Sequence, residues 1–250
     1  MDVMRIAVAG GTGWLGKLVV AEAERAGHEV VVIARSRGVD LVSGNGLTDA
    51  LRGVDVVVDV SNVQTLSGRK ATEFFETVTR NLLNAERRAG VRHHVLVSII
   101  GVDRVEWGYY QAKLHQEQIA LNGPVPATVL RAAQFHEFAE QSLTRFGGPV
   151  AVVPAMLSQP VAAREVAVEL VRLAEGEPAG LAPEIAGPEP LQMADLVRRV
   201  ARTRGPRKWV LTATMPGKAG RAMATGGNLP ATPGLRGTQT FDQWLTESRA

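Results

Sequence analysis

The chain has 250 residues, of which 45% are hydrophobic and 21% charged, as in soluble globular proteins and unlike disordered or fibrous ones. It contains no cysteine, which excludes disulfides, thiolate nucleophiles and cysteine-bound metal centres. The 28 basic and 25 acidic side chains give a net charge of +3, too small an excess to argue for a polyanionic partner. We therefore expect no metal and no nucleic-acid partner.

The start of the chain has no basic flank and cleavage site of the kind that marks a signal peptide. The longest apolar runs, such as residues 54–60 with Asp55 and Asp59, fall short of the ~18 uncharged residues of a membrane span. We expect a cytoplasmic protein with no membrane partner, either a monomer or a homodimer.

A glycine turn joins the first predicted strand, residues 6–9, to a helix over 14–26. Gly10, Gly13 and Gly16 lie three residues apart, a spacing typical of dinucleotide binding in this context. Gly10 permits the tight turn, Gly13 lets the backbone approach a pyrophosphate, and Gly16 allows close helix packing. The pyrophosphate would bind at the positive helix end, held by the amides of the segment that contains Thr12, Gly13, Trp14, Leu15 and Gly16. A glycine turn without a ligand is the alternative.

The second strand, residues 30–33, is a continuous apolar run, which is typical of a strand covered on both faces. Arg35, Ser36 and Arg37 follow it, where an NAD site usually has an acidic residue that binds the ribose. A guanidinium can instead pair with a 2′-phosphate, and a serine hydroxyl can donate to it. We therefore predict NADP(H) in preference to NAD(H); two solvated arginines and a loose preference are the alternative.

Further strands are predicted at residues 54–60, 95–97 and 127–130, separated by helices at 71–89 and 108–121. This alternation predicts a doubly wound parallel sheet of the Rossmann type, with right-handed crossovers.

Tyr109 and Lys113 are four residues apart on the predicted helix 108–121, so they share a helix face. Hydride reduction of a carbonyl needs a proton donor, and a phenol has an ordinary pKa near ~10. We expect a nearby ammonium to lower that pKa and to bind the nicotinamide ribose. Tyr109 is therefore the candidate acid and Lys113 its electrostatic partner and a cofactor contact, although a chance pair on a helix would look the same.

Prolines punctuate the chain after residue 150, between short predicted helices at 164–174 and 193–202. We expect residues 1–150 to form the dinucleotide-binding core. Residues 151–250 should form a small, mostly helical lid on the substrate side, packed on the core as part of one structural domain. Residues 217–236 are expected to be a flexible segment before a closing helix at 240–247.

These residues resemble the atypical extended short-chain dehydrogenase/reductase superfamily, especially its NmrA-like, NAD(P)-binding branch. The resemblance covers most of the chain and rests on the three glycines, on Arg35-Ser36, and on the segments at residues 97–103, 109–113 and 130–136. It implies that Ser61 and Asn62 line the ribose and pyrophosphate side and that Ser98 belongs to the cofactor site. The substrate side would include Tyr110, Gln134, Phe135 and His136.

The other histidines and the C-terminal tryptophans carry weaker signals. We expect His93 and His94 to be surface or helix-cap groups and His115 to be solvated or locally hydrogen-bonded. Trp209 and Trp244 should pack within the lid.

The function predicted is an NADPH-dependent oxidoreductase that transfers hydride to a small carbonyl or quinone-like substrate. Two alternatives use the same cofactor: an NADP(H)-sensing regulatory or scaffold protein without turnover, and an isomerase or epimerase in which Tyr109 acts as a base.

Overall fold

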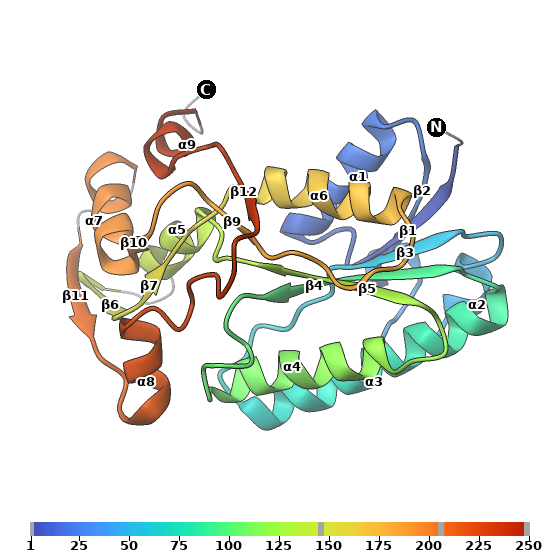
Figure 1. Ribbon diagram of the computed structural model, residues 1–250, viewed down its shortest axis with the longest axis horizontal. Helices are drawn as coiled ribbons and strands as arrows, with labels where there is room; N and C mark the ends of the chain where they lie inside the picture. Colours follow the sequence, from blue (N-terminus) through green and yellow to red (C-terminus); the bar gives the residue numbers. More distant parts are fainter. Residues whose placement is uncertain (1–2, 145–147, 205–207, 248–250) are drawn as a thin grey trace. The chain divides into compact units, whose positions relative to one another are not determined.

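The structure is a computed structural model that describes residues 3–144, 148–204 and 208–247 (Figure 1). The chain divides into two compact units, which interleave along the sequence. The first unit comprises Met1–Ser98, Gly108–Arg131 and Arg164–Ala182, and the second comprises Ile99–Trp107, Ala132–Ala163 and Pro183–Ala250.

A parallel sheet forms the centre of the first unit. The five main strands are β1 (Arg5–Ala9), β2 (Glu29–Ile33), β3 (Val56–Asp59), β4 (His93–Ile99) and β5 (Ala127–Ala132). They lie in the order β5-β4-β3-β1-β2, with the short strand β8 (Gly180–Leu181) parallel to β5. The strand order reverses between β1 and β3, and ligands of doubly wound folds bind at such a switch point, outside the carboxyl ends of the strands.

Helices cover both faces of this sheet (Figure 1). Helices α3 (Gly68–Ala89) and α4 (Gly108–Leu121) lie side by side on one face, while α1 (Trp14–Arg25) and α6 (Ala163–Glu175) lie on the other. Two short elements, η1 (Arg35–Arg37) and α2 (Leu47–Ala50), follow β2. The predicted Rossmann-type α/β fold is therefore confirmed.

Close packing of α3 on α4 depends on two glycines. A Cβ built on Gly68 would lie 2.9 Å from Cα of Gly108, closer than Cβ atoms approach other carbons, so the two backbones meet where neither residue has a side chain. Ser67 caps the start of α3 by accepting a hydrogen bond from Lys70 N at 3.3 Å. Gly90, with φ +77°, ends it in the left-handed conformation that glycine adopts without strain.

The second unit is built from short strands and four helices among the residues that the structure describes. In parallel pairs, β6 (Val150–Pro154) joins β11 (Trp209–Ala213) and β9 (Ile185–Ala186) joins β12 (Leu235–Arg236), whereas β7 (Leu157–Ser158) and β10 (Leu191–Gln192) are antiparallel. The helices are α5 (Glu137–Thr144), α7 (Met193–Thr203), α8 (Gly217–Ala224) and α9 (Phe241–Glu247).

Three expectations about the C-terminal part need correction. The boundary between the units does not fall at residue 150, because Arg164–Ala182 returns to the first unit, where β8 extends its sheet. Residues 217–236 are not simply a flexible segment: they contain α8 and β12. Trp209 is 77% exposed instead of packed, whereas Trp244 is buried and stacks with the Arg204 guanidinium 4.6 Å from its ring centre.

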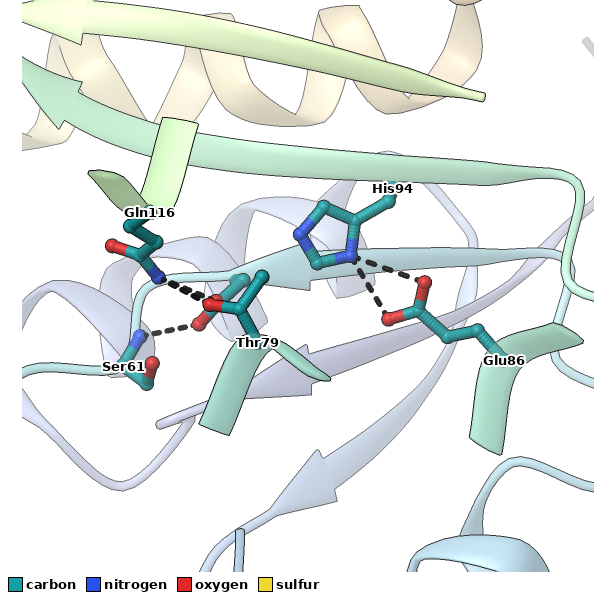
Figure 2. A network of polar contacts seen from close by, with 6 residues as sticks. Ser61, Thr79, Glu86, His94 and Gln116 are labelled. Carbon is teal, nitrogen blue, oxygen red and sulfur yellow. Dashed lines mark hydrogen bonds and ion pairs between the residues drawn. The ribbon is translucent and has the colours of Figure 1, made fainter. Parts of the chain in front are cut away.

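The two histidines at the start of β4 are also not surface groups. His93 and His94 are both buried, because β4 is a central strand with neighbours on both sides. Nε2 of His93 contacts Oγ1 of Thr128 at 2.8 Å, and burial lowers the pKa of His93 to about 4. Nδ1 of His94 contacts both carboxylate oxygens of Glu86, at 2.9 and 3.1 Å (Figure 2). His115 agrees with its prediction, since its side chain is partly exposed and contacts Glu76 at 3.3 Å.

No helix in the described part of the chain combines the length and the apolar character that crossing a bilayer requires.

Candidate dinucleotide site

The glycine turn after β1 closes on itself and on the end of β3. Gly10 has φ +81°, and a Cβ on it would lie 3.1 Å from both N and Cα of Ser61. Gly13 N donates to Gly10 O at 2.8 Å. A Cβ on Gly16 would lie only 2.1 Å from Gly10 O, so any side chain there would push the helix away from the strand. Gly10 and Gly16 thus have the roles in the turn and the packing that the sequence predicts.

The turn presents an exposed, positively polarised helix end. Helix α1 begins at Trp14, its first turn contains no acidic residue, and Gly13 supplies no side-chain cap. The first N–H groups of a helix have no intrahelical acceptor and carry a partial positive charge. A Cβ on Gly13 would meet only Gly10 O within 4 Å, at 3.1 Å, apart from its two neighbours in the chain, so no distant side chain covers that position. Thr12, Gly13 and Trp14 are exposed. Such a terminus suits a pyrophosphate.

The two arginines predicted to read the 2′-phosphate lie beside this turn. Ile33, the last residue of β2, accepts a hydrogen bond from Gly10 N at 3.0 Å, and η1 starts two residues later. Arg35, Ser36 and Arg37 are all exposed, and neither guanidinium forms an ion pair within the residues that the structure describes. Both cations are therefore available to an anionic ligand.

Ser61 and Ser98 supply two buried hydroxyl groups at the ends of β3 and β4. Ser61 is 6% and Ser98 3% exposed, and among the described residues neither Oγ has a hydrogen-bond partner. A buried hydroxyl without a partner is costly, so such groups call for an explanation such as a bound ligand. Together with the glycine turn, these hydroxyls fit a dinucleotide at the carboxyl ends of the strands.

Tyr109, in the first turn of α4, reaches back to the segment after β3. Its hydroxyl donates to Oδ1 of Asn62 at 2.5 Å, and its ring packs edge-on against Phe75 with the ring centres 5.7 Å apart. Burial raises the pKa of Tyr109 to about 12. The expected lowering of that pKa is therefore wrong, because loss of solvent disfavours the charged phenolate. The phenol therefore keeps its proton at neutral pH.

Lys113 lies one helical turn further along, with its ammonium inside the unit. Nζ donates to Val97 O at 2.8 Å and to Oε1 of Gln116 at 2.6 Å, and it lies 4.8 Å from the centre of the Phe75 ring. Burial lowers the pKa of Lys113 to about 8, against the opposing effect of Asp59 and Glu117. The ammonium is thus anchored to β4 and to its own helix, and one of its three N–H donors remains beyond these two hydrogen bonds.

The residues assigned to the substrate side are divided between the units. Tyr110 is in the first unit, where it is 2% exposed. Gln134, Phe135 and His136 belong to the second unit and follow β5. His136 is 1% exposed, and its Nε2 contacts Gln239 O at 3.1 Å. Its ring packs against those of Phe241 and Trp244 of α9, with centres 5.5 and 5.8 Å apart.

Sequence reasoning did not single out Asp59 or Gln116 as site residues. Both are buried, and they lie between Lys113 and Ser61 in a network of hydrogen bonds. Figure 2 shows Gln116 and Ser61 of this network. A signal was present in each case. Asp59 is an acidic residue in an otherwise apolar strand run, and Gln116 is three residues after Lys113, on the same helix face.

The fold and this site define a dinucleotide-binding α/β protein. A family model described as NAD(P)H-binding matches residues 10–172, a segment that contains the glycine turn, the two arginines, Tyr109 and Lys113. The chain belongs to this NAD(P)H-binding family, and a nicotinamide dinucleotide is its cofactor. This match confirms the NAD(P)-binding character that the resemblance implies.

Known proteins similar to this chain include enzymes and an assembly factor. The photosystem II assembly factor Ycf39 of Synechocystis is 32% identical over 111 residues, which is 39% of this chain and 34% of that protein, so the match spans about a third of its length. UDP-N-acetylglucosamine 4-epimerase from Bacillus cereus has a similar structure, with a TM-score of 0.72, 19% identity and coverage of 98% of this chain and 94% of that one. An NADPH-dependent quinone oxidoreductase from Escherichia coli has a TM-score of 0.68 and 18% identity, with 98% and 100% covered.

Proposed function

We propose that this protein is an NADPH-dependent oxidoreductase that reduces a small carbonyl or quinone-like compound. The observation that carries the proposal is the protonated Tyr109 phenol, held by Asn62 at the carboxyl end of β3, where the glycine turn closes against Ser61. A proton donor and a dinucleotide turn therefore meet on the same edge of one sheet. The fold permits such chemistry, since the quinone oxidoreductase of E. coli shares it.

NADPH would be held by groups from three segments of the first unit. The first-turn amides of α1 would bind the pyrophosphate, the exposed guanidiniums of Arg35 and Arg37 would pair with the 2′-phosphate, and the remaining Lys113 donor would bind the nicotinamide ribose. Ser61 and Ser98, whose buried hydroxyls have no other partner among the described residues, would contact the same cofactor. The dinucleotide, when bound, supplies the hydride.

Tyr109 would supply the proton that balances the hydride. A carbonyl that accepts hydride at carbon develops negative charge on oxygen, and the phenol O–H transfers its proton there to give the alcohol; a quinone becomes a hydroquinone by the same addition of one hydride and one proton. The alkoxide is a stronger base than the phenolate, so a phenol with a pKa of about 12 remains an effective donor. Asn62 would fix the phenol in place, and solvent would return the proton afterwards.

The test is to follow NADPH oxidation with a panel of aldehydes, ketones and quinones, using the intact protein and Tyr109→Phe. We expect turnover with at least one class and a loss of about 10²–10⁴-fold in Tyr109→Phe, with NADPH binding retained. His115→Gln is the matched control, since His115 is on the same helix but contacts Glu76. Tight NADPH binding without turnover on any compound would favour the NADP(H)-sensing function instead.

A further inference from the structure

We infer that Asp59 and Gln116, which we call the Asp59–Gln116 clamp, are positioning residues that hold Lys113 and the cofactor-facing Ser61–Asn62 turn in one buried network. This inference rests on the proposed NADPH site and adds two residues that do not themselves touch the cofactor. Cofactor affinity would then depend on Gln116, whose side chain lies in the interior of the unit.

Gln116 has all its hydrogen-bonding groups engaged. Its Oε1 accepts from Lys113 Nζ at 2.6 Å. Its Nε2 donates to Oδ2 of Asp59 and to Oγ1 of Thr79, each at 3.1 Å; Figure 2 shows Gln116 beside Thr79. The chemistry of the partners fixes the amide orientation, because an ammonium only donates and a carboxylate only accepts. A flipped amide would place like groups against each other on both sides. Gln116 therefore joins a cation to an anion in one arrangement only.

Asp59 extends the same network to the cofactor side of the unit. It is fully buried at the end of β3, and its Oδ1 accepts from Ser61 N at 2.8 Å. That bond fixes the backbone that lies 3.1 Å from the Cβ position of Gly10. Asn62, the next residue, accepts the Tyr109 hydroxyl. The Asp59 carboxylate thus has two tasks. Oδ1 holds the Ser61 backbone that lies against the glycine turn, and Oδ2 is linked to Lys113 through Gln116.

The charge on Lys113 depends on this arrangement. Burial favours the neutral amine and lowers the pKa of Lys113 to about 8, while Asp59 and Glu117 oppose that shift. Glu117 is itself engaged by Arg131 in a two-point ion pair at 2.7 and 3.0 Å, and the nearby His94 is paired with Glu86. Asp59 is left as the anion that the clamp links to the ammonium. Loss of the clamp should therefore neutralise Lys113 at a lower pH.

NADPH affinity across pH is the readout, since the cofactor is an anion and binds more weakly once Lys113 is neutral. Dissociation constants from fluorescence titration with NADPH, between about pH 6 and about pH 9, should show weakening in the intact protein as pH rises through about 8. In Gln116→Leu we expect the midpoint to fall by about one pH unit. The affinity would then be about fivefold weaker near pH 8 and nearly unchanged near pH 6.

Two more variants keep the test decisive. Asp59→Asn removes the anion and should also lower the pH midpoint of NADPH affinity. This variant tests the inference if Gln116→Leu does not fold. Gln116→Glu retains an acceptor for Lys113 and should keep the midpoint at or above that of the intact protein. Thr128→Val is the control: it removes a buried hydroxyl that contacts His93 and Ala179, each at 2.8 Å, and should leave the midpoint in place.

The possible results separate this inference from the proposed function. An unshifted midpoint in Gln116→Leu and Asp59→Asn, or an equal weakening at every pH, would overturn the clamp while leaving NADPH binding intact. Absence of NADPH binding by the intact protein would instead overturn the proposed site, and the clamp with it.

Discussion

The hydroxyl of Tyr109 donates a hydrogen bond to the side chain of Asn62, which lies 47 positions earlier in the chain. The bond joins the first turn of α4 to the residues that follow β3. It fixes the phenol at the edge of the sheet where the glycine turn lies, so the proposed proton donor is held by the segment that we propose to contact the cofactor.

Removing the acceptor tests whether these two residues act as a unit. Asn62→Ala should lower kcat about fivefold, because the phenol loses one hydrogen bond worth about 1 kcal/mol. Tyr109→Phe should have the larger effect, and the double variant should be no slower than Tyr109→Phe alone, since a phenol that is absent cannot be positioned. Steady-state rates of NADPH oxidation measure this; fully additive losses would mean that Asn62 acts on something other than Tyr109.

Two glycines of the turn should respond differently to alanine. A Cβ on Gly13 would lie 3.1 Å from one carbonyl oxygen, whereas a Cβ on Gly16 would lie 2.1 Å from that same oxygen, Gly10 O. Gly13→Ala should fold and bind NADPH at least about tenfold more weakly, because its methyl group occupies the pyrophosphate side. Gly16→Ala should lower the free energy of unfolding by about 3 kcal/mol, the upper range for overpacking.

Urea denaturation and NADPH titration separate these outcomes. Gly176→Ala is the control, since the nearest atom to its Cβ position is 3.6 Å away, an ordinary contact. Equal stability losses in Gly13→Ala and Gly16→Ala would contradict the assignment of separate binding and packing roles.

The proposed contact between Arg35 and a 2′-phosphate predicts that substitution of Arg35 affects NADPH and NADH binding differently. Arg35→Ala should weaken NADPH binding by about 1–3 kcal/mol, the range for a hydrogen bond to a charged group, and leave NADH binding nearly unchanged. Arg69→Ala serves as control, because Arg69 is an exposed cation already paired with Glu73 at 2.7 Å. Calorimetric titration with both cofactors provides the comparison. Equal weakening of NADPH and NADH by Arg35→Ala would remove the basis for NADP(H) preference.

The buried His94–Glu86 pair predicts a pH-dependent stability. Burial alone would lower the pKa of His94, but the Glu86 carboxylate outweighs it and the net shift is upward. The stabilisation is therefore fully present below the unfolded pKa of about 6.5 and is lost as pH rises through the higher folded value. Urea unfolding of the intact protein should show this loss relative to the double variant His94→Leu/Glu86→Met, which has neither group.

The single variant of that pair gives a second measure. His94→Leu alone leaves Glu86 as an uncompensated buried charge, which should cost about 3–5 kcal/mol, and the double variant should recover much of that loss. A single variant as stable as the double variant would contradict the expected cost of leaving the Glu86 carboxylate buried without its partner.

Hydrophobic periodicity predicted the five main strands and the long helices of the first unit, but not its short elements η1, α2 and β8. Continuous apolar runs, such as the one that ends at Ile33, correctly predicted parallel strands of the sheet, and the glycine spacing correctly predicted the turn after β1. These are local signals, because a strand covered on both faces and a strand–turn–helix transition each leave their pattern in adjacent residues. The way in which the two units interleave leaves no such local pattern. Helix α6 and strand β8 join the first unit through contacts with residues that are far from them in the sequence.

The sequence by itself determined the Rossmann-type fold, the glycine turn after β1 and the four-residue spacing of Tyr109 and Lys113, because each depends on neighbours along the chain. Only the tertiary structure decided the electrostatics of that pair. The desolvation that raises the pKa of Tyr109 and lowers that of Lys113 comes from α3 and the sheet packing around α4. Packing of α3 and α4 on the sheet, which residue spacing alone does not reveal, likewise placed His94 against Glu86 and Asp59 against Gln116.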